Sequence, residues 1–321
     1  MFRGQGHQYR WLVFDHETEY HGEPADEAER LDRLQGDIDW TVPAPGSIAS
    51  RFSAPSGDLA VVSLGDPRHP RVLLVPGVSG SKEDFVLVAP VLAAAGYYVQ
   101  SYDLAGQYES AAAGPRDGKK YDYALFRDDM VAMLEAGTGS NGQGAHVLGY
   151  SFAGTVAQQV TVERPELVRS LALLAAPPEP GNGFRGVRGL GPFTWMVNGR
   201  IGAALMTWGI VTNKNHVPPK RLEFVRMRFE YTSRLSMEHI IMLMKHAPDL
   251  RDRVRAVPIP KLVAVGEHDL WPPALHTEFA RRIGATLAVY KTGHSPCETT
   301  PNALARDLLA LYSQAGGASR A

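Results

Sequence analysis

The sequence contains a single cysteine, Cys297, in 321 residues. One thiol excludes an internal disulfide and is compatible with a reducing compartment, where Cys297 would act as a small apolar filler. The first ten residues are polar and lack the apolar segment of a secretory signal peptide. No apolar run reaches the roughly 18 to 20 residues of a transmembrane helix. We therefore expect a cytoplasmic protein that does not bind membranes.

A strong excess of charge of one sign is also missing. The formal net charge is −1 and the sequence pI is about 6.8, which gives no reason to expect a nucleic-acid partner. Eleven histidines are present, but none falls in an H-E-x-x-H or a Cys/His spacing, so we expect no metal site. The sequence predicts no cofactor. The expected partner is a small-molecule substrate, and the oligomeric state is left open.

What the sequence does contain is enough apolar residues for one large core. At 44% hydrophobic residues, a chain of this length buries roughly three quarters of its unfolded surface. Short apolar segments alternate with helix-compatible segments of ten to fifteen residues, which indicates βαβ units and a mostly parallel central sheet flanked by helices. The expected strands are 59–64, 72–75, 97–104, 145–150, 169–175, 261–265 and 287–290, and the expected helices are 26–35, 81–96, 121–135, 273–283 and 302–312.

The alternation fails between Pro178 and Pro258, a stretch that holds six of the nine methionines. Met237, Ile240, Ile241 and Met244 recur at helical spacing, which predicts an amphipathic helix. An insertion after a strand lies above the carboxyl edge of a parallel sheet, where ligands bind. We expect an N-terminal extension at 1–50, a core at 51–178 and 258–321, and an inserted helical cap at 179–257.

A cap rich in methionine and tryptophan favours an adaptable apolar pocket. The expected substrate-binding residues are Trp195, Met206, Trp208 and Met244. Alternatively, the methionines fill the core of the cap itself.

The N-terminal part of the chain and the predicted cap also differ in charge. Residues 1–60 carry a local charge of −6 and residues 181–255 one of +8. The basic cap either attracts an anionic substrate or is a solvated surface.

A strand that turns at once into a helix is predicted around Ser151. The apolar segment Ala145–Tyr150 ends at this serine, and a helix-compatible segment follows. Such a turn brings the residues two before and two after the corner together, so both must be small, as Gly149 and Ala153 are. The turn resembles the nucleophile elbow of the α/β-hydrolase family, with Ala153 at a position where the family usually has glycine. The resemblance covers residues 58–315 apart from the cap, and it implies a serine nucleophile at Ser151.

A serine hydroxyl needs a general base, and the base needs an acid that fixes its tautomer. His294 follows the last expected strand, and Asp269 follows the strand before it, so both belong to the same sheet edge as Ser151. The order Ser151, Asp269, His294 is that of α/β-hydrolase triads. Glu267 and Glu179 are the alternatives for the acid, and a histidine that merely caps a turn is the alternative for His294. We expect a structural role for His146 and surface positions for His268 and His276.

An oxyanion hole requires two backbone N–H donors. The resemblance implies Phe152 as one and Val78 as the other, with Ser79 as the nearby alternative; Pro76-Gly77 replaces the family's His-Gly.

Two further segments resemble family motifs. Residues 103–110 resemble D-x-x-G-x-G-x-S with Tyr108 at the second glycine, and residues 293–301 resemble G-H-x-x-x-x-E-x-P with Glu298 one place early.

Together these features predict a cofactor-independent serine hydrolase that forms an acyl-enzyme, a carboxylesterase or thioesterase for a small, largely apolar acyl substrate. The fold does not choose among reactions. Amide or carbon–carbon bond hydrolysis, perhydrolysis and acyl transfer remain open, as does a non-catalytic protein that binds or senses a small molecule on the same scaffold.

Overall fold

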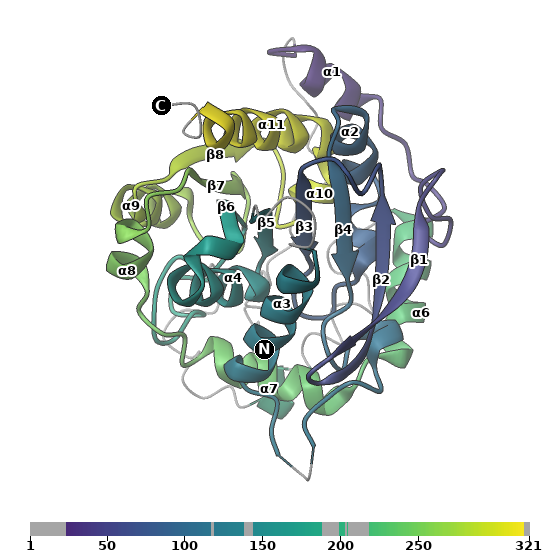
Figure 1. Ribbon diagram of the computed structural model, residues 1–321, viewed down its shortest axis with the longest axis vertical. Helices are drawn as coiled ribbons and strands as arrows, with labels where there is room; N and C mark the ends of the chain where they lie inside the picture. The colour runs from purple at the N-terminus through teal and green to yellow at the C-terminus, as the bar shows by residue number, and fades with distance from the viewer. Residues whose placement is uncertain are drawn as a thin grey trace, which may run out of the picture.

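The computed structural model describes residues 24–116, 119–137, 144–187, 199–202, 204 and 218–317. Its centre is an eight-stranded sheet in the order β1-β2-β4-β3-β5-β6-β7-β8 (Figure 1). β1 and β2 pair antiparallel, as do β2 and β4, and every other neighbouring pair is parallel. The strands are β1 (Ile48–Ala54), β2 (Gly57–Leu64), β3 (Arg71–Val75), β4 (Tyr98–Tyr102), β5 (Ala145–Tyr150), β6 (Val168–Leu174), β7 (Lys261–Gly266) and β8 (Thr286–Tyr290).

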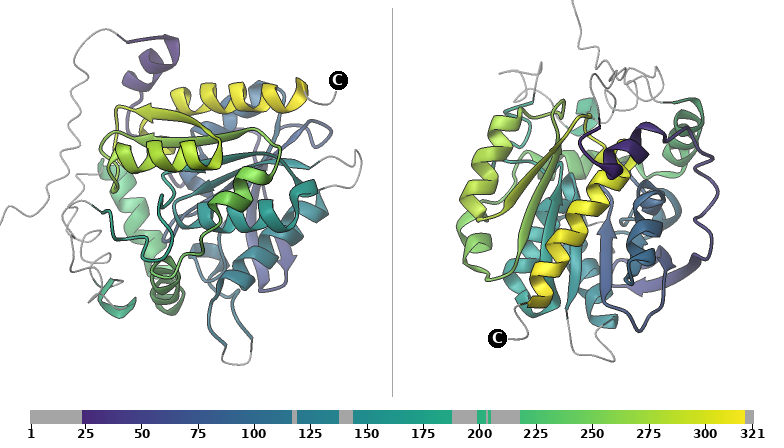
Figure 2. Two further views of the ribbon diagram at one scale, coloured as in Figure 1. Left: turned by 90° about the vertical axis from the view of Figure 1, so that its left-hand side faces the viewer. Right: turned by 90° about the horizontal axis from the view of Figure 1, so that it is seen from above.

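Helices cover both faces of this sheet (Figures 1 and 2). None of the described helices has the length and apolar character needed to span a bilayer. The α-helices are α1 (Glu27–Arg33), α2 (Val88–Ala94), α3 (Tyr123–Ala136), α4 (Phe152–Glu163), α6 (Pro219–Tyr231), α7 (Arg234–Met244), α8 (Arg251–Ala256), α9 (Pro273–Ile283), α10 (Pro296–Thr299) and α11 (Pro301–Gly317). Short 3-10 helices are η1 (Lys82–Phe85), η2 (Tyr108–Ser110) and η3 (Pro165–Leu167).

The alternation of side chains along the strands divides the core in two. Leu73, Val147 and Leu173 face one side of the sheet, where they pack with α3, α4, α8 and α9. Their neighbours in sequence face the other side and pack with α2 and α11, as Leu74 and Leu148 do. The central strands are therefore buried on both faces, which is why they read as continuous apolar segments. The predicted mostly parallel sheet flanked by helices is confirmed.

Two local features differ from the sequence-based expectation. β1 was not predicted, because its residues are mostly exposed at the sheet edge and carry no alternating apolar pattern. The single helix expected at 81–96 is divided into η1 and α2. Pro90 explains the break, since proline is tolerated in the first turn of α2 but not inside a continuous helix. The expected capping partner of Ser81 is present, because Asp84 Oδ2 accepts from the Ser81 backbone N–H at 3.2 Å.

The segment between β6 and β7 carries α6, α7 and α8, and we call it the β6–β7 insertion. Buried ion pairs connect its helix α6 to Asp84 of η1 and to Glu298 of α10. Arg221 donates from Nη2 to Asp84 Oδ1 at 2.8 Å and from Nε to Glu298 Oε2 at 2.9 Å, and Arg228 Nη1 reaches the same Asp84 oxygen at 2.5 Å. The Arg221 side chain is only 3% exposed. Each buried charge therefore has a partner, as burial requires.

The N-terminal segment packs against both α11 and α6. The Asp32 carboxylate accepts the backbone N–H groups of Asn302 and Ala303 at the start of α11, at 2.8 and 3.0 Å. The Trp40 ring lies 4.3 Å from the Arg221 guanidinium and the Asp37 carboxylate accepts the Lys220 backbone N–H at 2.8 Å. Residues 32–40 thus connect α11 to the first turn of α6.

Removing the Arg221 charge should destabilise the fold. We expect Arg221→Met to lower the free energy of unfolding by about 3 to 5 kcal/mol, because Asp84 and Glu298 would remain buried with less compensating charge. Urea unfolding measures the change. Arg281→Met is the matched control, since its ion pair with Glu278 is exposed and exposed pairs contribute little to stability. Equal losses in the two variants would contradict the assignment of a stabilising role to the buried pair.

Candidate active site

The turn between β5 and α4 holds Ser151 in a strained conformation. Its φ is +51°, a region that non-glycine residues rarely adopt. The chain passes so close to itself that a Cβ on Gly149 would lie 2.5 Å from the Ala153 carbonyl oxygen. The Ser151 backbone N–H donates to the Leu174 carbonyl at 2.8 Å, which holds the corner to β6. The requirement for small residues on both sides of the corner is therefore met, with alanine in place of glycine at 153.

His294 reaches Ser151 from the loop after β8. Its Nε2 lies 3.3 Å from Ser151 Oγ. The imidazole contacts the rings of Tyr150 and Trp271, whose centroids are 5.5 and 5.9 Å away. Trp271 is itself fixed, because its Nε1 donates to the Gly183 carbonyl at 2.7 Å. Contacts with two aromatic rings thus help to orient the imidazole that faces the serine.

Asp269, in the turn after β7, contacts the other nitrogen of His294. The distance from Asp269 Oδ1 to His294 Nδ1 is 2.5 Å, and the Leu270 backbone N–H donates to the same oxygen. Burial by itself raises the pKa of Asp269, but the charge and hydrogen bond of His294, together with the nearby His276, outweigh burial and lower the pKa to about 2. Asp269 is therefore ionised at neutral pH. The three side chains predicted from the sequence converge at one sheet edge.

His276 does not lie on the surface, so that expectation was wrong. The residue is fully buried in α9, and its Nε2 lies 3.3 Å from Asp269 Oδ2. Although the two atoms are close, neither has a hydrogen-bond partner among the described residues. The helix turns His276 inward because α9 packs its Phe279 and Ile283 on the sheet. The apolar spacing of 276, 279, 280 and 283 was the available signal in the sequence.

The other candidates lie elsewhere. His268 is half exposed and pairs with Glu267, whose side chain is 42% exposed. Glu179 is partly buried and interacts with Arg251. His146, at the start of β5, is buried, and its Nδ1 forms a hydrogen bond with Ser170 Oγ at 2.8 Å. Burial, with the nearby charge of Arg169, lowers the pKa of His146 to about 3.

Backbone amides adjoin Ser151 on two sides. Gly77 is so close that a Cβ there would lie 2.9 Å from Ser151 Cβ, which brings the following residue, Val78, beside the serine. Phe152 begins α4 directly after it. In the part of the chain that the structure describes, neither the Val78 nor the Phe152 N–H donates to another protein group. The Ser79 N–H is already occupied, because it donates to Gln107 Oε1 at 2.9 Å.

An apolar cluster of α7 residues lies against Val78. Met237 and Ile241 are 2% exposed and pack with Val78, Phe184 and Phe229. Met244 is buried one turn further along α7, but it belongs to the main core of the sheet. The predicted stripe of α7 is thus buried as expected. Three other residues expected to bind substrate, Trp195, Met206 and Trp208, lie outside the described residues.

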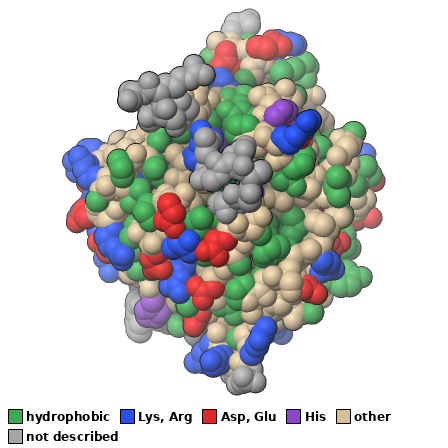
Figure 3. All heavy atoms as spheres, in the orientation of Figure 1, with side chains coloured by type: hydrophobic (Ala, Val, Ile, Leu, Met, Phe, Trp, Pro, Cys, Tyr) green, Lys and Arg blue, Asp and Glu red, His purple; other side chains and the backbone are tan. Residues whose placement is uncertain are grey.

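The positive charge of the β6–β7 insertion is partly used inside the protein. Arg221 and Arg228 are buried and paired with carboxylates, so these two cations are not available to attract an anion. On the face shown in Figure 3, Lys and Arg side chains lie among Asp and Glu side chains. The buried pairs therefore account for part of the positive charge of the insertion without an anionic ligand.

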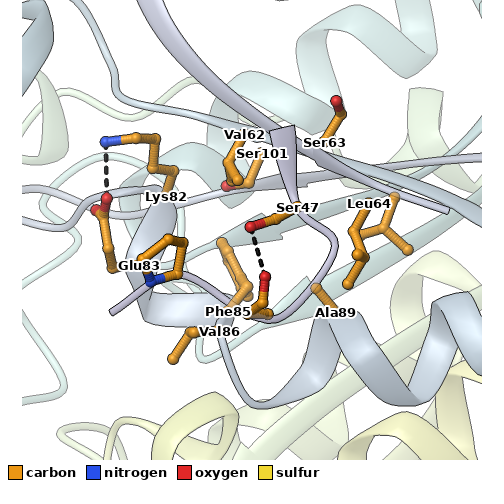
Figure 4. A pocket seen from close by; sticks show the side chains of 13 residues that line it. Ser47, Val62, Ser63, Leu64, Lys82, Glu83, Phe85, Val86, Ala89 and Ser101 are labelled. Carbon is orange, nitrogen blue, oxygen red and sulfur yellow. Dashed lines mark hydrogen bonds and ion pairs between the residues drawn. The ribbon is translucent and has the colours of Figure 1, made fainter. Parts of the chain in front are cut away.

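A small apolar cavity of about 50 Å³ lies away from the candidate site (Figure 4). It lies between the segment before β1, strands β2 and β4, and the helices that follow β3, and Ser151, Asp269 and His294 are not among its lining residues. Its size suits at most a water molecule or two. Among the described residues, no group of three His, Cys, Asp or Glu side chains is arranged to hold a metal ion.

The ionised Asp269 should contribute pH-dependent stability. Because its folded pKa is depressed from 3.8 to about 2, the contribution is present above pH 4 and disappears as the pH falls from about 4 to 2. We expect the unfolding free energy difference between wild type and Asp269→Asn to shift by about 2 kcal/mol over this interval. Urea titrations at several pH values measure it, with the exposed Asp128→Asn as control. A difference that does not vary between pH 5 and pH 2 would contradict the assignment.

The fold agrees with comparisons to known proteins. The chain is similar in structure to an enol-lactonase from Burkholderia xenovorans LB400 (TM-score 0.67, 17% identity, covering 82% of this chain and 100% of that one). It is also similar to the thioesterase domain from the curacin biosynthetic pathway (TM-score 0.60, 18% identity, 82% and 99%). A third similar structure comes from a study of carboxylesterases of Nitrososphaera gargenis (TM-score 0.68, 17% identity, 84% and 99%).

At these identities the solved structures show the fold alone. No curated protein matches the chain in sequence. A family model described as "Alpha/beta hydrolase family" matches residues 72–307, which includes Ser151, Asp269 and His294 together with the strands that precede them. The chain therefore belongs to the alpha/beta hydrolase family.

Proposed function

We propose that this protein is a serine hydrolase that forms an acyl-enzyme with an ester or thioester of a small, largely apolar acyl group. Ser151 is the nucleophile, His294 the general base and acid, and Asp269 the residue that orients His294. The amides of Val78 and Phe152 form the oxyanion hole. The observation that carries this proposal is the continuous set of contacts from Ser151 Oγ to His294 Nε2 at 3.3 Å and from His294 Nδ1 to Asp269 Oδ1 at 2.5 Å.

The electrostatics of these contacts support proton transfer in one direction. The ionised Asp269 favours the tautomer with the proton on Nδ1, which leaves the Nε2 lone pair facing the Ser151 hydroxyl. Ser151 Oγ then bonds to the acyl carbon while its proton passes to Nε2 and the carbonyl electrons move to oxygen. When the tetrahedral intermediate collapses, the departing alcohol or thiol takes the proton from His294. Water repeats the sequence, releases the acid and returns the proton to Ser151.

The developing oxyanion requires two amides that are not already bonded. The Val78 and Phe152 N–H groups meet this condition, whereas the Ser79 N–H is bonded to Gln107. This difference supports Val78 over Ser79 as the second donor. Preorganised amides of this kind are among the largest contributions to catalysis of acyl transfer.

The acyl class follows from the surface next to the oxyanion amides. Val78, Phe184 and Phe229 are partly exposed and pack on the buried Met237 and Ile241. These three side chains offer apolar contacts, and a charged acyl chain would lose hydration there without a partner. α6 and α7 act as the described part of a cap over the site. A carboxylesterase or a thioesterase activity is consistent with all these contacts, and an aligned triad supports catalysis over the small-molecule-binding alternative.

Removal of the proposed nucleophile should abolish turnover. We expect Ser151→Ala and His294→Ala to lower kcat for p-nitrophenyl butyrate by about 10⁶-fold, and Asp269→Asn by about 10⁴-fold. Steady-state kinetics and labelling with a fluorophosphonate measure the effect, and mass spectrometry should locate one label on Ser151. Ser101→Ala is the matched control, since this serine is buried and its hydroxyl has no partner among the described residues. Turnover by Ser151→Ala near the wild-type rate would exclude the mechanism.

The acyl preference has its own test. Because the proposed wall is apolar, kcat/KM should rise from the acetyl to the butyryl or hexanoyl ester and should fall for a succinyl monoester of the same length. A panel of p-nitrophenyl esters and acyl-coenzyme A thioesters measures both trends. A preference for the succinyl ester would contradict the apolar acyl class while leaving the serine mechanism intact.

A further inference from the structure

The turn at residues 103–110 lies between the loop that carries Val78 and the helices of the β6–β7 insertion. The link between α6 and α7 forms hydrogen bonds with the backbone of this turn. The Ser233 N–H, just before α7, donates to the Gly106 carbonyl at 2.8 Å, and Thr232 Oγ1, just after α6, accepts the Tyr108 N–H at 3.1 Å. Tyr108 occupies a left-handed conformation with φ +39°, at the motif position where glycine was expected, and its ring packs edge-on against Phe224.

Gln107, in this turn, is fully buried and uses both ends of its side-chain amide. Its Oε1 accepts the Ser79 backbone N–H at 2.9 Å, and its Nε2 donates to Ser236 Oγ of α7 at 2.7 Å. Ser236 Oγ in turn donates to the Ala105 carbonyl at 3.1 Å. A single side chain therefore joins the Val78 loop to α7 through well-formed hydrogen bonds that are shielded from water.

The residue that Gln107 holds is in a strained conformation. Ser79 has φ +57°, which is unfavourable for a residue with a Cβ and persists only where surrounding contacts impose it. Gly77, two residues earlier, already lies against Ser151. A relaxation at Ser79 would therefore move the Val78 amide, which lies between these two points, relative to Ser151.

α7 also packs closely against the turn at residues 103–110. A Cβ on Gly106 would lie 2.5 Å from Ser236 Cβ, so the helix cannot approach more closely. The next residue of α7, Met237, packs in the cluster that contains Val78. α7 thus contacts the Val78 loop twice, once through Gln107 and once through apolar side chains.

We propose that Gln107 is a positioning residue that holds the Val78 amide in the oxyanion hole and couples its position to α7. The proposal rests on the proposed serine hydrolase function. Gln107 touches neither Ser151 nor the acyl group. It acts through Ser79, so its loss should weaken stabilisation of the oxyanion and leave substrate affinity nearly unchanged.

The first experiment separates the two hydrogen-bonding ends of the side chain. Gln107→Met keeps the length and removes both ends, and we expect kcat for p-nitrophenyl butyrate to fall by about 10²-fold, the loss typical of one oxyanion donor, with KM changed less than about 3-fold. Gln107→Glu keeps the acceptor for the Ser79 N–H, so its kcat should be at least about tenfold higher than that of Gln107→Met. Gln158→Met, a buried glutamine of α4 bonded to the Gly154 carbonyl, is the matched control and should keep the wild-type kcat.

The second experiment reports on the oxyanion directly. A trifluoromethyl ketone with the same acyl chain forms a tetrahedral adduct with serine, and its Ki should rise in Gln107→Met by the same factor as kcat/KM falls. Ser236→Ala should lower kcat by a smaller factor, and the double variant should be no worse than Gln107→Met alone, because the two residues act through one path.

Several outcomes would overturn the proposal. A folded Gln107→Met variant with wild-type kcat would do so, as would equal losses in Gln107→Met and Gln107→Glu, or a Ki that does not follow kcat/KM. Should Gln107→Met fail to fold, a wild-type kcat in Ser236→Ala would overturn the coupling to α7. Activity that survives Ser151→Ala would instead refute the underlying serine mechanism, whatever Gln107 does.

Discussion

The close approach of the chain to itself at Ser151 is the constraint on which the rest of the site depends. Gly149, Ala153 and Gly77 leave no space for larger side chains around the corner, and the corner residue is held at positive φ by its bond to β6. This crowding places the serine hydroxyl at the carboxyl edge of the sheet, with two backbone amides close to it. A strained, well-supported turn supplies both the nucleophile and the stabilisation of charge.

Buried polar contacts connect the β6–β7 insertion to the loops of the site. Arg221 joins α6 to Asp84, shortly after the Val78 loop, and to Glu298, four residues after His294. Gln107 joins the Val78 loop to α7. Because buried charges and amides are costly without partners, such contacts tolerate few alternative arrangements. The insertion is therefore fixed to the site by directional bonds as well as by apolar packing, and substrate contacts with α6 or α7 act on the same loops.

Several tertiary contacts show the structural role of residues whose role the sequence left open. Glu298 stands one place early in its motif, and the structure pairs it with Arg221. Ser79 and Val78 were both candidates for the second amide, and the bond to Gln107 distinguishes them. His276 was expected on the surface but lies beside Asp269. For Glu298 and Ser79 the deciding partner lies in another element of the chain, so no local pattern contains the information.

The sequence by itself determined the mostly parallel sheet, most element positions and the convergence of Ser151, Asp269 and His294. The physical reason is that strand and helix periodicity is local, and that residues after parallel strands must meet at one edge. β1 escaped prediction because an exposed edge strand has no apolar alternation. Only the tertiary structure decided which amide is free, which arginines are buried and how α6 and α7 are fastened. Those outcomes depend on contacts between separate elements of the chain, such as Gln107 with Ser79 and Ser236, and Asp84 with Arg221.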